Sequence, residues 1–214
     1  MNDIVILAIV FAVQFTLVFG SIVLHEIAHG YTAWRLGDPT ARMQGRITLN
    51  PLAHIDPFGT ILLPLFLAYM NMQSSSYIPI IGWAKPVPIN PGYFRDPLRG
   101  MMLTGLAGPL TNFAIALGAA LLFWTCWFVK LKIAMFLCGT LFGINVYLGL
   151  FNLLPVPPLD GSRVVAGLIP RQWVGSYLSI ERYGIFILYG IIFMGLHRHI
   201  LDPIYNLAMK LIGE

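Results

Sequence analysis

Charged residues are scarce in this sequence. Only 10% of the 214 residues are Asp, Glu, Lys or Arg, against about 25% in a typical soluble domain, and 57% are hydrophobic. The mean hydropathy is +0.77. The apolar residues are gathered into long runs, so the composition excludes an ordinary soluble domain. It predicts a polytopic integral membrane protein embedded in a lipid bilayer.

Cysteine is equally scarce, with only Cys126 and Cys138. Both lie within apolar runs and form neither a CxxC motif nor a zinc-ribbon spacing, so we expect free thiols and no disulfide framework. The formal charge of +4 comes from Lys and Arg residues at the ends of apolar runs, without a basic stripe interleaved with aromatic residues. This pattern excludes nucleic acid as an expected partner and fits the positive-inside rule of membrane proteins.

Internal repeats, linkers and low-complexity segments are also absent from the sequence. The length therefore suits one compact membrane domain over residues 1–214, without an added soluble domain. The first apolar run, residues 4–24, carries no charge, follows Asp3 rather than Lys or Arg, and lacks a small-residue cleavage site. We expect it to be a retained membrane helix and not a signal peptide.

The apolar runs predict an all-α fold with about five to six membrane-embedded helical segments. We expect core spans at about 4–36, 101–129 and 133–154 and C-terminal helices within 183–212, the tail being suited to the membrane interface. A small β-strand element, "GRITLN" at 45–50, is expected between the first and second segments. Segment 58–70 is apolar but short and contains Pro64, so it is either re-entrant, strongly tilted, or paired with a return through residues 77–83.

The stretch "HEIAH" places His25 and His29 four residues apart, with Glu26 beside the first. On a helix these two imidazoles lie on one face and can share one metal ion, while Glu26 can reach a water on that ion. Chance predicts roughly 0.002 such motifs in a chain of this composition. A merely structural trio is disfavoured, because ionisable groups beside a membrane span are costly and usually functional. The residue types favour zinc, one ion per chain.

A catalytic zinc site normally has a third protein ligand and keeps its fourth position for water. The extension HExxHxxGxxH is absent, because Arg35 stands where its last His would be. The remaining candidates are His54, Asp38, Asp56, Asp96, Asp160, Glu181, His197 and His199.

Asp160 is the strongest of these candidates. It follows an apolar span within the proline-rich turn "PVPPLDG", and irregular backbone at membrane depth is tolerated where it lines a cavity. Two other possibilities stay open: Asp160 caps the helix that begins at "DGSRVV", or His54 in "PLAHIDP" supplies the third ligand.

Topology offers an independent argument. The motif and Asp160 must lie at similar depth, so an even number of crossings must separate them, and runs 101–129 and 133–154 supply two. If 58–70 is re-entrant, 9 of the 13 basic residues share one side, which the positive-inside rule makes cytoplasmic. These nine are Arg35, Arg42, Arg46, Lys85, Arg95, Arg99, Arg163, Arg171 and Arg182.

Three elements together resemble the site-2 protease family of intramembrane zinc metalloproteases, peptidase family M50. They are "HEIAH" (25–29), "LAGPLTN" (106–112) and "NLLPVPPLDG" (152–161), in the family's order and at the corresponding ends of apolar runs. The resemblance covers most of the chain. It is to the minimal form of the family, without a PDZ or CBS domain.

The resemblance implies a set of roles. His25, His29 and Asp160 would hold zinc, Glu26 would be the general base and acid, and Asn112 and Asn152 would line the active site. The substrate would be a single-pass or membrane-proximal segment of another membrane protein, cleaved in regulated intramembrane proteolysis. We expect residence in a prokaryotic cytoplasmic membrane with the active site towards the cytoplasm. We also expect "GRITLN" to offer an edge for an extended substrate and 58–70 to form a gate.

The alternative function is a metal-binding membrane protein without proteolysis, such as a metal carrier or an inactive regulator that sequesters membrane helices. Glu26 separates the two functions, because a carrier needs ligands but has no need for a base at that position. The sequence leaves the substrate's identity and the oligomeric state open.

Overall fold

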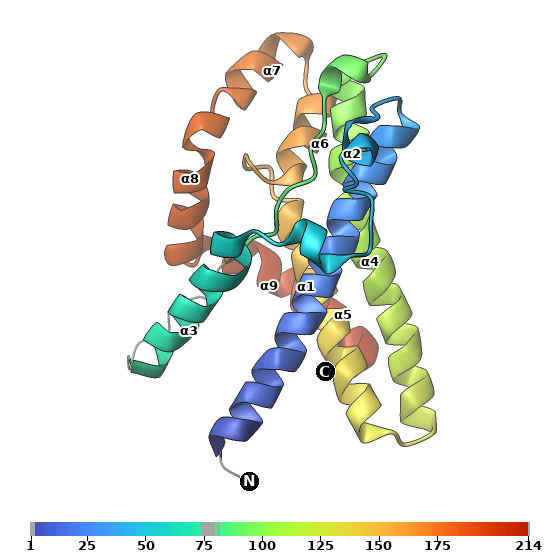
Figure 1. The fold of residues 1–214 in the computed structure, drawn as a ribbon, viewed down its shortest axis with the longest axis vertical. Helices are drawn as coiled ribbons and strands as arrows, with labels where there is room; N and C mark the ends of the chain where they lie inside the picture. Colours follow the sequence, from blue (N-terminus) through green and yellow to red (C-terminus); the bar gives the residue numbers. More distant parts are fainter. Residues whose placement is uncertain (1–2, 74–79, 81, 214) are drawn as a thin grey trace.

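The computed structural model describes residues 3–73, 80 and 82–213, and the part described is helical (Figure 1). The elements in chain order are α1 Asp3–Arg35, α2 Thr40–Met43, the 3₁₀ turn η1 Pro51–His54, the π-helical turn η2 Pro57–Leu62, α3 Leu63–Gln73, η3 Pro91–Tyr93, α4 Pro97–Phe128, α5 Lys132–Asn152, α6 Asp160–Leu168, α7 Arg171–Leu178, α8 Glu181–Phe193, α9 Leu196–Met209 and η4 Lys210–Ile212.

Three helices in the described part are long and apolar enough to cross a membrane: Ile9–Arg35, Pro97–Phe128 and Lys132–Asn152. They match the three expected core spans. The C-terminal helices α8 and α9 qualify only as a bent pair, with an angle of 67° between them. The bend falls at Gly195, whose φ of +69° is a left-handed conformation that favours glycine. The described residues thus contain three candidate spans, or four with this pair, and the expected five to six membrane-embedded segments are not confirmed.

Helices α4 and α5 form an antiparallel hairpin that returns the chain to the level at which it started. Small and aromatic residues pack the hairpin, with Ala116 and Ala119 of α4 against Phe142 and Val146 of α5 in one buried cluster. Close approach through small residues is typical of membrane helix pairs. Figure 1 shows the N-terminus and the α4–α5 turn at one end of the molecule, and α2, the start of α4 and α7 at the other. The described residues thus contain two helices long and apolar enough to supply the two crossings that the parity argument requires.

The expected strand at 45–50 is wrong. These residues form turns and bends, and no strand occurs anywhere in the described part of the chain. A strand needs a partner with free backbone donors, and the segment that packs alongside contains Pro86 and Pro88, which have none. The Arg46 guanidinium instead donates to the carbonyl oxygens of Lys85 and Pro86, at 2.6 and 3.2 Å. The suggested edge for substrate pairing at "GRITLN" therefore fails with the strand.

Segment 58–70 begins in a π-helical turn and continues as α3. Asp56 caps the turn, since its carboxylate accepts from the backbone amides of Phe58 and Gly59. Helix α3 is too short for an upright span and projects away from the helical bundle (Figure 1). Whether it is re-entrant or tilted stays a prediction, and the suggested return through 77–83 falls largely on residues outside the described part.

Candidate active site

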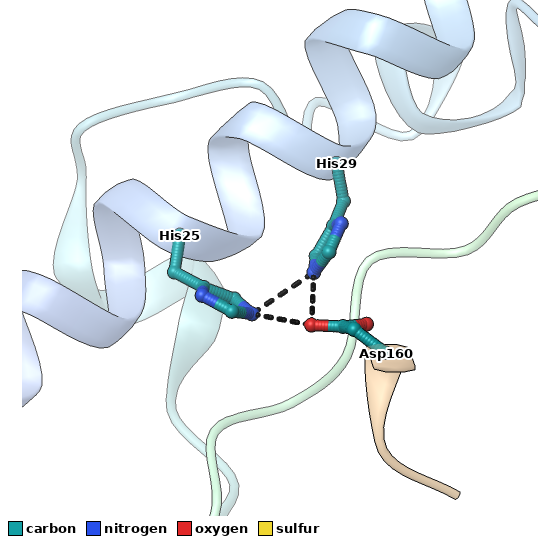
Figure 2. A group of neighbouring side chains, drawn as sticks. All are labelled: His25, His29 and Asp160. Carbon is teal, nitrogen blue, oxygen red and sulfur yellow. Dashed lines mark hydrogen bonds and ion pairs between the residues drawn. The ribbon is translucent and has the colours of Figure 1, made fainter. Parts of the chain in front are cut away.

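Helix α1 presents His25 and His29 on one face, one turn apart. Their Nε2 atoms are 3.0 Å apart, and both side chains are buried. Figure 2 shows the two rings pointing from α1 towards Asp160, which lies on a separate element. The helical spacing read from the sequence therefore produces the expected convergence.

Asp160 begins α6 and reaches both imidazoles. Its Oδ2 lies 3.0 Å from Nε2 of His25 and 3.2 Å from Nε2 of His29. Gly161 allows this placement, because a Cβ there would stand 2.2 Å from the carbonyl oxygen of Leu153 at the end of α5. Burial by itself favours the neutral acid, but the hydrogen bonds to the two histidines outweigh it and lower the pKa of Asp160 to about 2. The carboxylate is therefore ionised at neutral pH.

Acceptors on α4 fix the proton positions of both imidazoles. Nδ1 of His29 lies 2.7 Å from the carbonyl oxygen of Thr104, which can only accept, so this nitrogen carries the proton. Nδ1 of His25 lies 2.5 Å from Oδ1 of Asn112, which is buried on the same helix. In the neutral rings both Nε2 atoms are then left with lone pairs that point at Asp160.

Three acceptors thus face one another, and this arrangement fits a cation. Two imidazole lone pairs and a carboxylate oxygen within 4.8 Å of one another repel unless a positive ion lies between them. Either a proton on an imidazole or a metal ion supplies that charge. Two nitrogen donors and one oxygen donor match the ligand set of catalytic zinc, and the second hydrogen bond on each imidazole is the usual support of such ligands.

Gly108 of α4 makes room for the two rings. A Cβ at this position would lie 2.5 Å from Cε1 and Nε2 of His25 and 2.6 Å from Cε1 of His29. Real Cβ atoms do not make such approaches, so the imidazoles pack directly on the backbone of α4. The glycine of "LAGPLTN" is therefore part of the site's architecture.

Comparison with known proteins decides the family. The model of peptidase family M50 matches residues 129–195. A Bacillus subtilis protein named "Putative zinc metalloprotease YwhC" is 38% identical over 194 residues, covering 87% of this chain and 82% of the relative. The chain belongs to peptidase family M50.

More distant relatives of this M50 chain are longer. A Mycolicibacterium smegmatis protein named "Putative zinc metalloprotease Rip2" is 32% identical over 66% of this chain and 51% of its own length. Zinc metalloprotease MJ0392 of Methanocaldococcus jannaschii is 29% identical over 78% of this chain and 37% of its own length. No solved structure matches.

Glu26 of the M50 chain is held by a backbone amide. Its Oε2 accepts from the N–H of Val87 at 2.8 Å, and Val87 also packs on α1, since its side chain lies within 2.9 Å of where a Cβ of Gly30 would be. The charge of Glu26 acts on His29, one turn away on the same helix. The carboxylate therefore lies next to the three-acceptor group without joining it.

An extended segment, residues 83–90, carries Val87 past the site. Buried groups hold it along its length: Arg46 binds two of its carbonyl oxygens, the amide of Lys85 donates to the carbonyl oxygen of His54, and the amide of Asn90 donates to Oδ2 of Asp38. Asp38 and His54 are fully buried. They thus position the segment that contacts Glu26.

The other predicted residues lie outside this group. Asn152 is at the end of α5, where its side-chain amide donates to the carbonyl oxygen of Leu148. His54 pairs through Nε2 with the carbonyl oxygen of Thr48. Asp56 and Asp96 cap helical turns, and Glu181 pairs with Arg163. The described residues that could hold a metal together do not include His54, Asp56, Asp96, Glu181, His197 or His199.

Sequence reasoning missed two residues that support the site. Asn145 of α5 is fully buried and receives a hydrogen bond from Asn112, and Ser21 of α1 receives one from Asn145. A signal was present, because an amide in the middle of an apolar span is costly and usually has a role. Ser21 also stands four residues before His25, on the same face of the helix.

Proposed function

We propose that this M50 chain is an intramembrane zinc endopeptidase that hydrolyses peptide bonds within or near transmembrane segments of other proteins. The observation that carries the proposal is the convergence of His25, His29 and Asp160 from two elements, near the C-terminal end of a membrane-length helix, with Glu26 beside them. These three residues would hold one zinc ion. The names of the relatives, which describe zinc metalloproteases, support the same reaction.

The chemistry follows from the residues present. Bound zinc supplies a water whose pKa is lowered to about 7 and polarises the scissile carbonyl. Glu26 accepts the proton of the attacking water at its carboxylate and delivers it to the leaving amine. The amide of Val87 uses one acceptor position on Oε2, and a carboxylate has further lone pairs, so Glu26 can keep this hydrogen bond while it acts on water. His29 and His25 each donate a hydrogen bond from Nδ1 to an acceptor on α4, and these bonds hold the rings in place.

The substrate's peptide bond has to be exposed before it can react. A helical transmembrane segment shields its backbone in intrahelical hydrogen bonds, so the segment must unwind locally at the site. We assign the active site to the cytoplasmic side of a cytoplasmic membrane, because most basic residues lie on the side of the HEIAH motif. Helix α3 remains our candidate for the gate through which the substrate arrives.

The experiment that tests the proposal is Glu26→Gln, with zinc content and cleavage of a transmembrane model substrate measured on the same preparation. Gln keeps the shape and an acceptor for Val87 but cannot take a proton. Retained zinc with cleavage lost is the expected result. A non-proteolytic metal carrier would keep its function in this variant, and cleavage at the wild-type rate would overturn the assigned role of Glu26.

A further inference from the structure

A chain of buried amides runs from the site into the apolar interior. Nδ2 of Asn112 donates to Oδ1 of Asn145 at 2.9 Å, and Nδ2 of Asn145 donates to Oγ of Ser21 at 2.9 Å. Asn112 and Asn145 are fully buried and Ser21 is 2% exposed. The chain starts at His25 on α1, crosses α4 and α5, and returns to α1 one turn before the histidine.

The far end of this chain has a fixed direction. Nδ2 of Asn145 also lies 2.9 Å from the carbonyl oxygen of Leu141, and the hydroxyl of Ser21 donates to the carbonyl oxygen of Leu17 at 2.8 Å. Backbone carbonyls only accept hydrogen bonds, so the amide nitrogen of Asn145 must face Leu141. Its oxygen must then face Asn112.

This direction is transmitted to the histidine. Because Asn112 meets an acceptor on Asn145, it turns its nitrogen there and its oxygen towards His25. Nδ1 of His25 lies 2.5 Å from that oxygen and must donate, so the neutral ring keeps its proton on Nδ1. Nε2 is then a free lone pair aimed at Asp160. A reversed Asn112 would demand the opposite tautomer and would put a proton where the metal has to bind.

We propose that Asn145 is a positioning residue that sets the tautomer of His25 through Asn112 and thereby prepares the ring to bind zinc. His29 needs no such device, since the carbonyl oxygen of Thr104 fixes its Nδ1 proton directly. The hydrogen-bonded side chains from Asn112 to Ser21 are all buried, so water cannot offer Asn112 an alternative partner and the direction set by Asn145 is kept. The inference rests on the proposed zinc site but is independent of proteolysis.

The test compares zinc affinity among variants by chelator competition on detergent-solubilised protein. Asn145→Leu has a similar size but no acceptor, so Asn112 is free to reverse, and the affinity should fall by about 10- to 100-fold, as for other lost supports of metal ligands. Asn145→Asp, protonated in this buried position, still accepts from Asn112 and donates to Leu141, so it should stay within a few-fold of wild type. Ser21→Ala should also stay within a few-fold, because the Leu141 carbonyl alone fixes the direction.

A matched control lies on the same helix. Thr140→Val removes a side-chain hydrogen bond to the α5 carbonyl of Phe136 and leaves the amide chain intact, so zinc affinity should be unchanged. Wild-type zinc affinity in Asn145→Leu would overturn the inference. Failure of the wild-type protein to bind zinc, or binding that survives loss of His25, would instead contradict the proposed function.

A spectroscopic reading covers the case in which Asn145→Leu does not fold. In ¹⁵N-histidine-labelled, zinc-free wild-type protein, with His25 assigned by the signal missing in His25→Asn, the neutral ring should carry its proton on Nδ1. A neutral His25 with its proton on Nε2 in the wild-type protein would overturn the proposal without any variant at position 145.

Discussion

At the residue scale, the site is a set of three acceptors whose arrangement suits a cation. Asp160 and the Nε2 atoms of His25 and His29 lie within hydrogen-bond distance of one another. The Nδ1 atoms of the two rings donate their protons to acceptors on α4. The HEIAH motif predicted two of these groups, because helical spacing alone brings them together. Asp160 could be ranked first but not placed from sequence, because its approach depends on the tight contact of Gly161 with the end of α5.

The third ligand can be tested by a pair of substitutions. Asp160→Asn keeps the shape of the side chain but removes the charge of a direct ligand, so zinc affinity should fall by more than the roughly 10- to 100-fold that loss of an outer support costs. His54→Ala should leave zinc binding unchanged, because the His54 ring is used against the carbonyl oxygen of Thr48. Equilibrium dialysis with radioactive zinc measures both. The opposite pattern, with zinc lost only in His54→Ala, would assign the third ligand to His54.

Zinc affinity should rise with pH. The pKa of Asp160 is lowered to about 2 from its ordinary 3.8, so this carboxylate is ionised at neutral pH, and zinc displaces a proton held within the three-acceptor group. Each displaced proton changes the affinity by about tenfold per pH unit. Calorimetry in two buffers of different ionisation enthalpy should detect proton release. A pH-independent affinity between pH 5 and 7 would contradict the arrangement.

The same shift predicts the acid sensitivity of the zinc-free protein. A carboxyl group whose pKa is lower in the folded state stabilises the fold above its unfolded value, here about 3.8, and loses that contribution as the pH falls towards about 2. Asp160→Asn should remove this part of the pH dependence.

At the element scale, the predictable parts are the long helices and the unpredictable parts are the connections. Runs 4–36, 101–129 and 133–154 became α1, α4 and α5, because continuous apolar sequence of that length has few alternatives in a membrane. The strand expected at 45–50 failed because distant partners decide that loop: Arg46 binds carbonyl oxygens nearly forty residues away. No local pattern reports such a contact.

Helix α4 should tolerate a methyl group far from the site and not at it. Gly108→Ala puts a Cβ within 2.6 Å of both imidazoles, so the rings must move and zinc binding should be lost or reduced at least about tenfold. Gly118→Ala is the matched control on the same helix, because its Cβ would meet open space. Measuring the zinc content of the two purified variants tests this difference. Normal zinc in Gly108→Ala would contradict the packing of the site.

At the scale of the whole molecule, the α4–α5 hairpin explains how residues 25 and 160 meet at one depth. Two helices of membrane-spanning length return the chain to the end where α1 finishes, and the basic residues around that end predict that this side is cytoplasmic. The parity argument took this contact as its premise and required two intervening spans, for which α4 and α5 are long enough. The placement of α3 could not be predicted in this way, because an apolar run too short to cross the membrane can lie in more than one orientation.

Cysteine labelling tests this orientation. In a background with Cys126→Ser and Cys138→Ser, we expect Arg95→Cys to react with a membrane-impermeant maleimide only after the cells are broken. Leu131→Cys, in the α4–α5 turn, should react in intact cells. Both positions are exposed in the fold, so accessibility does not distinguish them. The reverse pattern would place the active site on the outer side.

The central claim is that zinc held by this site cleaves a peptide bond within or next to a membrane span. The most direct measurement reconstitutes the protein in lipid vesicles with a single-pass substrate and determines the product masses. We predict a cut inside or at the edge of the apolar segment, abolished by a zinc chelator and restored by zinc. An intact substrate with the zinc-loaded protein, or cuts confined to remote soluble parts, would contradict the account.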